Sequence, residues 1–298
     1  MIPKECMQRL KQAVRLHLNL LYWRVRAIRS RHMDCSRGPV FIVGTGRSGT
    51  HFLAECLITH PLLNDLTNGR ENTYVFFDIA EGALHQQFDS AFCARLAARF
   101  RLLVRAAYPS LLVDQSHPSL WYSDSLAEAF PGARFIGIIR DPMAVAYSTL
   151  NHAGVRRWLE QGPREGLSPV FLGVLPGEED LFYEWSLVER SARRWASHIV
   201  RLSRAVEKLG ERLWLLNYED LCRDPASQMS GIAKHLNLEP TFEVPKVRME
   251  SLTKKNALDP TLVMKAKKQL ARFFEVQRPC QAVRDRLVGY EGSEQWCS

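Results

Sequence analysis

The sequence predicts an α/β protein, a three-layer fold in which a mostly parallel sheet is covered by helices on both faces. Short apolar segments of β-rich composition alternate with longer amphipathic segments, and the first apolar segment runs through a glycine-rich turn into a helix. Strands separated by helices run parallel, so a ligand is expected at their carboxyl ends. A content of 46% hydrophobic and 24% charged residues is typical of a folded globular chain.

Residues 5–31 predict an amphipathic basic helix. Apolar side chains recur at steps of three and four residues, at Leu10, Val14, Leu18, Leu21, Tyr22, Val25 and Ile28. Basic residues outnumber the one acid, Glu5, so this segment supplies much of the formal charge of +8. Two interpretations stay open: the helix packs on the domain with a solvated basic face, or it lies on an anionic membrane or a partner. The break at 35–39 separates residues 1–37 from one domain over residues 38–298.

The elements of this domain follow in order. A buried strand from Val40 leads into the glycine turn, and the helix "THFLAECLITH" follows. The later predicted elements are a helix at 91–108, a strand in "SLLVDQS", a helix at 124–130, a strand in "ARFIGIIR", a helix after Asp141-Pro142, a Gly/Pro-rich segment at 162–177, a helix at 180–209 and a strand in "RLWLLNY".

The seven cysteines are scattered without a C-x-x-C pair, which argues against a zinc site and a dense disulfide framework. We expect reduced thiols, with a bridge between Cys280 and Cys297 as the alternative. The sequence shows neither an apolar run long enough to span a membrane nor a signal-peptide pattern. A cytoplasmic protein is therefore expected, with any membrane contact made through residues 5–31, and neither a metal nor a nucleic acid is expected as a partner.

The stretch "FIVGTGRSGTHFL" predicts an anion-binding loop. A glycine-rich turn between a buried strand and a helix directs backbone N–H groups and the positive end of the helix dipole at one point. Gly44, Gly46 and Gly49 supply the turn. A nucleoside triphosphate loop would need lysine directly after Gly49, where this chain has Thr50, and its cation is Arg47 instead.

A second phosphate site is predicted at "FIGIIRDPMAVAYS". Arg140 at the end of a strand offers a bidentate guanidinium group, and Pro142 starts a helix. Ser148, eight residues after Arg140, lies about two turns along that helix, on the same face as its start. Such a pair is suited to a phosphate monoester.

Together the two stretches resemble the nucleotide-binding motifs of the PAPS-dependent sulfotransferases, a family with a P-loop-like sheet. The resemblance covers about residues 38–240 and includes "AFPGARF" and "LNYEDL". It implies transfer of a sulfuryl group from 3′-phosphoadenylyl sulfate (PAPS) to a hydroxyl or amine, without a metal. The other product would be adenosine 3′,5′-bisphosphate (PAP).

The resemblance also implies roles for residues around the donor. Arg47 would stabilise the leaving phosphate, Arg140 and Ser148 would bind the 3′-phosphate, and a basic loop would close over the nucleotide. For Phe52 the alternative is a position in the apolar core. For the two lysines of the predicted loop the alternative is a solvated position on the surface. The donor-binding residues expected from the resemblance are Gly46, Arg47, Ser48, Gly49, Thr50, His51, Phe52, Arg140, Ser148, Tyr218, Lys254 and Lys255.

Two residues are candidates for the base that accepts the acceptor's proton. Glu71 in "NGRENTY" resembles the acid of tyrosylprotein-type members, and His117 in "DQSHPS" resembles the histidine of cytosolic small-molecule members, although Gln115 replaces their lysine. A histidine suits base chemistry near neutral pH, whereas a glutamate needs desolvation. For each, a hydrogen bond that holds a loop is the alternative.

The acceptor is left open as a glycan, a peptide tyrosine or a small molecule. Segments 62–90 and 153–180 are expected to select it. The second contains Arg156, Arg157, Trp158 and Arg164, which would suit a glycan or another acidic acceptor, or form an ordinary surface loop.

Two other functions are compatible with parts of the sequence. A P-loop kinase or NTPase would require the lysine that the loop lacks and an aspartate that binds Mg²⁺. A non-catalytic protein that binds a polyanion or a membrane would explain the basic N-terminal helix, but it predicts loss of Arg47, Arg140 or Ser148, and all three are present. The sequence says nothing about the oligomeric state.

Overall fold

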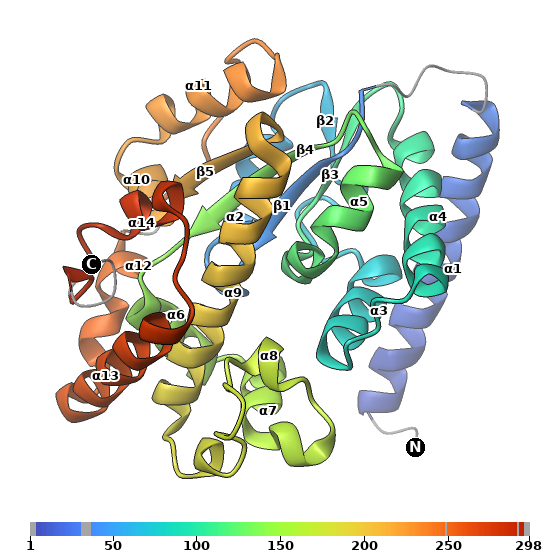
Figure 1. Cartoon of the computed structure of the whole chain (residues 1–298). Coiled ribbons are helices and arrows are strands. Elements are labelled where there is room, and N and C mark those ends of the chain that lie inside the picture. Colours follow the sequence, from blue (N-terminus) through green and yellow to red (C-terminus); the bar gives the residue numbers. More distant parts are fainter. Residues whose placement is uncertain (1–3, 31–36, 248, 291, 295–298) are drawn as a thin grey trace.

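The computed structural model describes residues 4–30, 37–247, 249–290 and 292–294, and within these ranges five parallel strands form the central sheet (Figure 1). The strands are β1 (Val40–Gly44), β2 (Leu63–Asn64), β3 (Leu111–Asp114), β4 (Arg134–Ile139) and β5 (Leu213–Asn217). Their order is β2-β3-β1-β4-β5, so β1 is central and the chain crosses from one side of it to the other after β3. The predicted parallel sheet is confirmed.

Helices cover both faces of the sheet, because β1 alternates its buried side chains between two apolar cores. Val40 and Ile42 belong to one core, and Phe41 and Val43 belong to the other. The helices of the first core are α2 (Thr50–Leu57), α10 (Tyr218–Arg223) and α11 (Pro225–Leu236), and those of the second include α4 (Ser90–Ala107), α5 (Ser123–Ala129) and α9 (Leu187–Leu209). The predicted three-layer α/β fold is confirmed.

Further helices complete the described structure. They are α1 (Lys4–Arg29), α3 (Thr73–Leu84), α6 (Pro142–Leu150), α7 (Ala153–Gln161), α8 (Pro169–Leu172), α12 (Glu250–Thr253), α13 (Pro260–Val276) and α14 (Gln281–Leu287), with the 3₁₀ helices η1 (His117–Tyr122), η2 (Pro163–Glu165), η3 (Leu181–Tyr183), η4 (Gly210–Arg212) and η5 (Lys254–Ala257). Helices α3 and α7 lie in the segments 62–90 and 153–180, for which the sequence assigned no helix.

Two predicted elements differ from the structure. The helix predicted from residue 180 begins at Leu187, because Ser186 and Glu189 form a reciprocal pair of capping hydrogen bonds there. The loop predicted around Lys254 and Lys255 is wrong, since α12 continues directly into η5. The backbone N–H of Leu258 closes η5 by donating to the Lys255 carbonyl at 3.0 Å.

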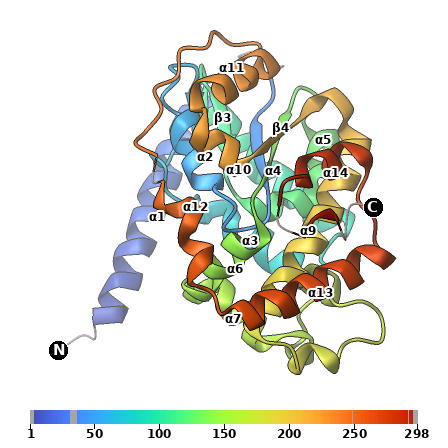
Figure 2. The same cartoon turned by 90° about the vertical axis from the view of Figure 1, so that its left-hand side faces the viewer.

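Helix α1 packs along α4, and its N-terminal end extends beyond the rest of the domain (Figures 1 and 2). Trp23 and Ala27 make the contact and are 2% and 8% exposed, and Arg26 donates to the Tyr108 carbonyl at 2.9 Å. The predicted apolar stripe lies on the outside instead. Its described members are 42–64% exposed, namely Val14, Leu18, Leu21, Tyr22, Val25 and Ile28. The helix therefore packs on the domain, but through a face that the stripe did not identify.

Parts of the remaining predictions lie outside the described residues. The side chain of Leu10 lies outside the described residues, and so do Arg31, Cys35 and Cys297. The alternative bridge between Cys280 and Cys297 therefore stays a prediction. Within the described residues Cys56, Cys93, Cys222 and Cys280 are free thiols. No helix in this part of the chain combines the length and apolar character needed to cross a membrane.

Candidate active site

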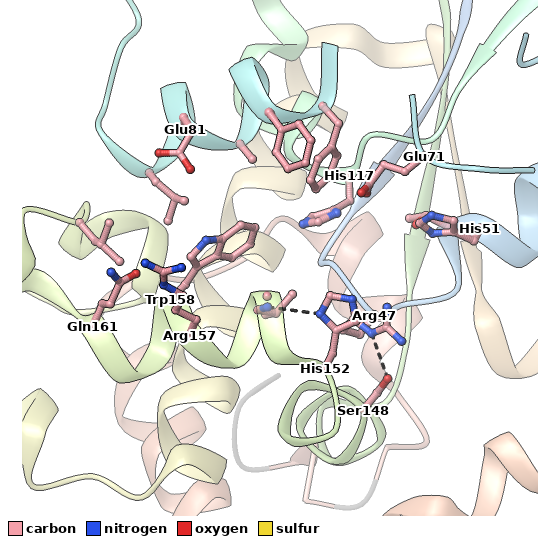
Figure 3. A pocket seen from close by; sticks show the side chains of 18 of the residues that line it. Arg47, His51, Glu71, Glu81, His117, Ser148, His152, Arg157, Trp158 and Gln161 are labelled. Atoms are coloured by element: carbon pink, nitrogen blue, oxygen red, sulfur yellow. Dashed lines mark hydrogen bonds between the residues drawn. The ribbon is translucent and has the colours of Figure 1, made fainter. Parts of the chain in front are cut away.

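A cavity of about 810 Å³ is lined by the glycine loop after β1 and by side chains of α3, α6 and α7 (Figure 3). Charged and polar groups gather in one part, and Figure 3 shows Arg47, His51, Glu71 and His117 there. We call this part the polar end, formed by Arg47, Gly49, Thr50, His51, Glu71, His117, Arg140, Ser148 and His152. The apolar end is formed by Phe76, Phe77, Ala80, Leu84, Val155, Trp158 and Leu167, and the rim by Glu81, His85, Arg157, Gln161 and Glu165.

The glycine loop holds an unusual backbone conformation. Gly49 is the N-cap of α2 with a φ of 96°, and a β-carbon there would lie 2.2 Å from Cδ2 of Tyr218. Arg47 also has a positive φ, at 77°, although it is not a glycine. A side chain held in this region costs on the order of 1–3 kcal/mol, and such residues cluster at functional sites. The loop therefore stores strain at the position of its cation.

Arg47, Arg140 and Ser148 lie together at the polar end. Nε of Arg47 donates to Oγ of Ser148 at 3.1 Å, across 101 residues of sequence. Arg140 donates from Nη1 to the Arg47 carbonyl at 3.0 Å and from Nη2 to the Ser251 carbonyl at 2.8 Å. The two predicted phosphate motifs thus share one network, in which the fork of Arg140 contacts backbone oxygens.

Tyr218 and Phe52 lie behind this network. The guanidinium carbon of Arg140 lies 4.3 Å from the centre of the Tyr218 ring, and the Tyr218 hydroxyl is 2.8 Å from Oγ of Ser251. Phe52 meets the same ring edge to face, with centres 6.3 Å apart. It packs against the smaller core and does not line the cavity, while keeping the aromatic contact with Tyr218.

Several buried polar atoms around the loop lack a hydrogen-bond partner within the described residues. They include Oγ of Ser48, Oγ1 of Thr45 and Nε of Arg140, although these residues are 1%, 2% and 7% exposed. Buried polar groups are nearly always satisfied, so each such atom calls for an explanation. An anion on the loop would supply acceptors for these donors.

Glu71 follows a short segment, residues 68–70, that is held by hydrogen bonds. The amide of Gln115 donates to the Arg70 carbonyl at 2.8 Å, and the Asp65 carboxylate accepts from the N–H groups of Asn68 and Gly69 at 2.8 and 2.6 Å. Burial raises the pKa of Glu71 to about 7, with Asp114 adding to the rise and Arg47 opposing it. Glu71 therefore ionises close to neutral pH.

His117 begins η1 and is only 6% exposed. Its Nε2 has no hydrogen-bond partner among the described residues, and its ring lies 5.9 Å from that of Phe76. Burial lowers the pKa of His117 well below its usual value, and the nearby charge of Arg194 lowers it further. The imidazole is therefore neutral and a weak base in this structure.

Two other histidines complete the polar end. His51 follows the loop in α2, and His152 caps α7, where its Nδ1 accepts from the Val155 N–H at 3.3 Å. Burial and the charge of Arg47 lower the pKa of both. Burial and then Arg140 likewise lower the pKa of Arg47 itself. These shifts mark a region of positive potential suited to an anion.

The lysine pair does not line the cavity. Lys255 forms an ion pair with Asp141 at 2.5 Å, and Lys254 is exposed. Closure of a basic segment over a nucleotide stays a prediction.

The remaining predicted residues are placed around the polar end. Gly46 and Ser48 lie between β1 and α2, Thr50 is the first residue of α2, and Tyr218 is the first residue of α10, directly after β5. The sequence missed His152 and Arg194, which lies under the loop, and it named Trp158 only as part of the segment expected to select the acceptor. No motif marks them, because their positions depend on the packing of α7 and α9. In the described ranges no cluster of three His, Cys, Asp or Glu side chains could hold a metal ion.

Comparison with known proteins identifies one family. The model of the sulfotransferase family matches residues 39–243. A sulfotransferase domain from the curacin biosynthetic pathway is 18% identical, with a TM-score of 0.48, covering 85% of this chain and 98% of its own. The sulfotransferase of Alicyclobacillus acidocaldarius is 20% identical, with a TM-score of 0.48 and coverages of 83% and 99%. Mouse sulfotransferase SULT7A1 complexed with PAP is 12% identical, with a TM-score of 0.44 and coverages of 84% and 88%. The search of curated proteins gives no match.

Proposed function

The chain belongs to the sulfotransferase family, and from that premise we propose that it transfers a sulfuryl group from PAPS to a hydroxyl or amine of an acceptor. The observation that carries this proposal is the shared network of Arg47, Arg140 and Ser148 beside unsatisfied buried donors at the glycine loop. Those donors fit the phosphate groups of PAPS. In this proposal PAPS supplies the sulfuryl group. The side chains of the polar end bind the nucleotide and accept the proton that the acceptor loses.

The proposed reaction requires charge stabilisation and one proton transfer. Arg47 stabilises the negative charge that develops on the 5′-phosphate as PAP leaves. The acceptor oxygen or nitrogen gains a bond to sulfur while the bond between sulfur and the phosphate oxygen breaks. Glu71 takes the acceptor's proton, which keeps the charges balanced, and the polar end holds the two reactants in line.

Glu71 is the base that the charges favour. Its pKa of about 7 leaves a substantial carboxylate fraction at neutral pH and also gives it useful basicity. His117 has a pKa well below its ordinary value, so it is deprotonated but too weak a base to be favoured. We propose that His117 instead offers Nε2 as a hydrogen-bond acceptor within the polar end.

The donor is tested by measuring nucleotide binding. Calorimetric titration with PAP and with ATP–Mg²⁺ separates a PAPS site from a site for nucleoside triphosphates. We expect PAP to bind more tightly, because the loop lacks the lysine that contacts a γ-phosphate. Tighter binding of ATP–Mg²⁺ would contradict the proposed function.

We also propose that residues 1–37 add a membrane-contacting element to the domain of residues 38–298, and that α1, packed on α4, touches an anionic membrane surface with its outer face. The exposed apolar stripe, which includes Leu18, Leu21 and Ile28, lies on the same helix as the arginines at positions 15, 24 and 29. Apolar insertion and attraction to anionic headgroups act together on such a helix.

Sedimentation with vesicles tests this contact. The full chain should bind vesicles containing phosphatidylglycerol more strongly than vesicles of phosphatidylcholine alone. Replacing both Leu18 and Leu21 by serine should weaken that binding, since both side chains are 63% exposed and make little contribution to the fold. Equal binding of the variant would remove α1 from the contact.

A further inference from the structure

The apolar end of the cavity limits what the acceptor can be. We propose that the acceptor is a small, uncharged alcohol or phenol with an apolar body, rather than a polyanionic glycan or an acidic peptide. This inference rests on the proposed function, because it assumes that the acceptor's hydroxyl group faces Glu71 at the polar end.

The walls of the apolar end come from two helices and the segment between α7 and α8. Leu84 and Ala80 of α3 are 1% exposed, and Val155 of α7 is 4% exposed. Trp158 extends from α7 into the same part of the cavity (Figure 3). The walls are tied together, since the N–H of Ser168 donates to the Leu84 carbonyl at 2.7 Å. Such a surface binds apolar atoms by removing both partners from water.

Phe77 shows that this surface lacks a partner in the chain. Its side chain is 57% exposed at the wall of the cavity, while its neighbour Phe76 is 8% exposed. An exposed aromatic side chain that borders a buried apolar wall gains contact when a ligand covers it. We therefore place the body of the acceptor against Phe77 and Trp158.

The rim does not carry the positive charge that an acidic acceptor would need. It contains two acids, Glu81 and Glu165, beside Arg157 and His85. Glu81 lies 3.5 Å from Nε2 of His85, which partly compensates both groups if the histidine is protonated. A polyanion would meet carboxylates at the entrance, and like charges repel.

Two of the arginines that the sequence suggested for binding a glycan form ion pairs outside the cavity. Arg156 pairs with Glu160 at 2.7 Å, and Arg164 pairs with Asp180 at 2.8 Å. Neither lines the cavity, and of the three arginines at 156, 157 and 164 only Arg157 does so. These arginines do not form one basic surface, because consecutive residues of a helix such as α7 point to different sides.

The cavity's size also matches a small acceptor. Its volume of about 810 Å³ lies within the range of roughly 300–1,000 Å³ that is usual for sites that enclose small ligands. The same space must also admit the reactive sulfate of the donor.

The test uses 2-naphthol as the neutral probe, with a carboxylated oligosaccharide and an acidic tyrosine peptide as charged probes. PAP binding to the free protein is measured first, because its absence would defeat the proposed function itself. Calorimetry on the PAP-saturated protein then measures binding of each probe. We expect binding of 2-naphthol and its sulfation by PAPS with a kcat/KM at least about tenfold above the charged probes. Failure of 2-naphthol to bind while PAP binds, or preference for a charged probe, would overturn the inference.

Two variants locate the probe, and a third is the control. Trp158→Ala should raise the KM for 2-naphthol about tenfold through lost apolar contact and leave PAP affinity unchanged. Phe77→Lys places a charge on an exposed position and should reduce 2-naphthol turnover while improving the acidic peptide. Arg156→Ala changes a residue of α7 that does not line the cavity, and it should alter neither the KM for 2-naphthol nor the turnover of the acidic peptide. Unchanged KM values in the first two variants would place the acceptor elsewhere.

A second inference concerns Arg194, a residue that lies under the glycine loop. Its side chain is 0% exposed, and none of its three guanidinium nitrogens has a hydrogen-bond partner among the described residues. A β-carbon on Gly46 would lie 3.0 Å from Nη2 of Arg194 and 2.5 Å from Nε2 of His117. The guanidinium group and the imidazole therefore both lie against the backbone of the loop.

Its neighbour in α9 is a buried arginine whose charge has a carboxylate partner. Arg193 pairs with the Glu178 carboxylate and lies over the rings of Trp185 and Phe273 at 4.8 and 4.9 Å. Arg194 has no such carboxylate; its guanidinium carbon lies 5.7 Å from the centre of the Phe171 ring, and burying a charge without an anionic partner is costly. We infer that Arg194 is a positioning residue of the donor site, whose charge is compensated when an anion binds on the loop above it.

Thermal unfolding with and without PAP tests this role. In Arg194→Met the side chain keeps its bulk and loses its charge, so the protein without nucleotide should unfold at the same or a higher temperature. The rise in Tm that PAP produces should shrink, and PAP affinity should fall about tenfold. In Arg193→Met the Tm without nucleotide should fall instead, with the PAP-induced rise preserved.

Arg194→Lys provides the second variant, since it keeps the charge and should retain more of the PAP-induced rise than Arg194→Met. NMR titration of His117 adds a further readout, because removing the charge of Arg194 should raise the pKa of that imidazole. A lower Tm with an unchanged PAP effect in both Arg194 variants would show a purely structural role and overturn the inference.

Discussion

The polar and apolar ends of the cavity are built in different ways. The polar end takes Arg47, His117 and Arg140 from the chain that follows β1, β3 and β4, so the sheet places them. The apolar end comes from α3 and α7, two helices outside the sheet. Hydrogen bonds require particular atoms at fixed positions, whereas an apolar wall requires only volume and shape. Motifs therefore mark the polar end and leave the apolar end unmarked.

The largest expected effect follows from removing the base at the polar end. Glu71→Gln should lower kcat by about 10²–10⁴-fold, since the amide cannot accept the acceptor's proton, while PAP affinity changes little. Steady-state kinetics with calorimetry measures both quantities. Glu81→Gln, the same substitution at the rim, is the control and should retain kcat. A fully active Glu71→Gln protein would assign the base elsewhere.

Arg140→Ala should weaken PAP binding by about 1.5–3 kcal/mol, the range for hydrogen bonds to charged groups. Calorimetric titration measures the loss, and Arg134→Ala at the start of the same strand is the matched control, because its side chain contacts the Glu211 carbonyl away from the cavity. Equal PAP affinity in the two variants would exclude Arg140 from the donor site.

The pH dependence separates the two candidate bases. A base acts in its deprotonated form, so with Glu71 the value of kcat/KM should rise with pH, by about tenfold per unit below pH 7, and level off above it. With His117, whose pKa lies well below its ordinary value, the rate should already be level at pH 7. A profile that stays flat from pH 6 to pH 8 would therefore count against Glu71.

A smaller effect is expected at the apolar end. Phe77→Ala should raise the KM for a neutral phenol a few-fold, on the order of 1 kcal/mol of lost contact, because the ring is 57% exposed before the ligand covers it. Thermal stability should be nearly unchanged for the same reason. A loss of PAP affinity in this variant would show that the two ends are not separate.

The smallest effect is expected for Lys255→Ala. Lys255 pairs with Asp141 outside the cavity, and a partly exposed ion pair contributes roughly 0–1 kcal/mol. PAP affinity should therefore change by less than about fivefold, as measured by the same titration. A loss as large as that of Arg140→Ala would instead support closure of this segment over the nucleotide.

Much of the fold follows from local patterns. The buried β1, the glycine turn and α2 are predictable because strand, turn and helix preferences act over a few residues. The spacing from Arg140 to Ser148 predicts a shared side because a helix repeats every 3.6 residues or so. The sequence predicts the start of α9 at residue 180, because apolar residues occur before Ser186. The helix begins later, since Ser186 and Glu189 form the capping hydrogen bonds.

Residue types and short spacings along the chain thus determined the α/β fold, the anion loop with Arg47 and the family resemblance. Tertiary structure alone decided that α1 packs through Trp23 and that Gln115 holds the segment of Glu71 from 45 residues away. It also placed the Arg194 guanidinium under the loop without a hydrogen-bond partner among the described residues. It also decided that Arg156 and Arg164 do not line the cavity, whereas Arg157 does. These features depend on contacts between distant segments, and local propensity carries no information about which distant surfaces will meet.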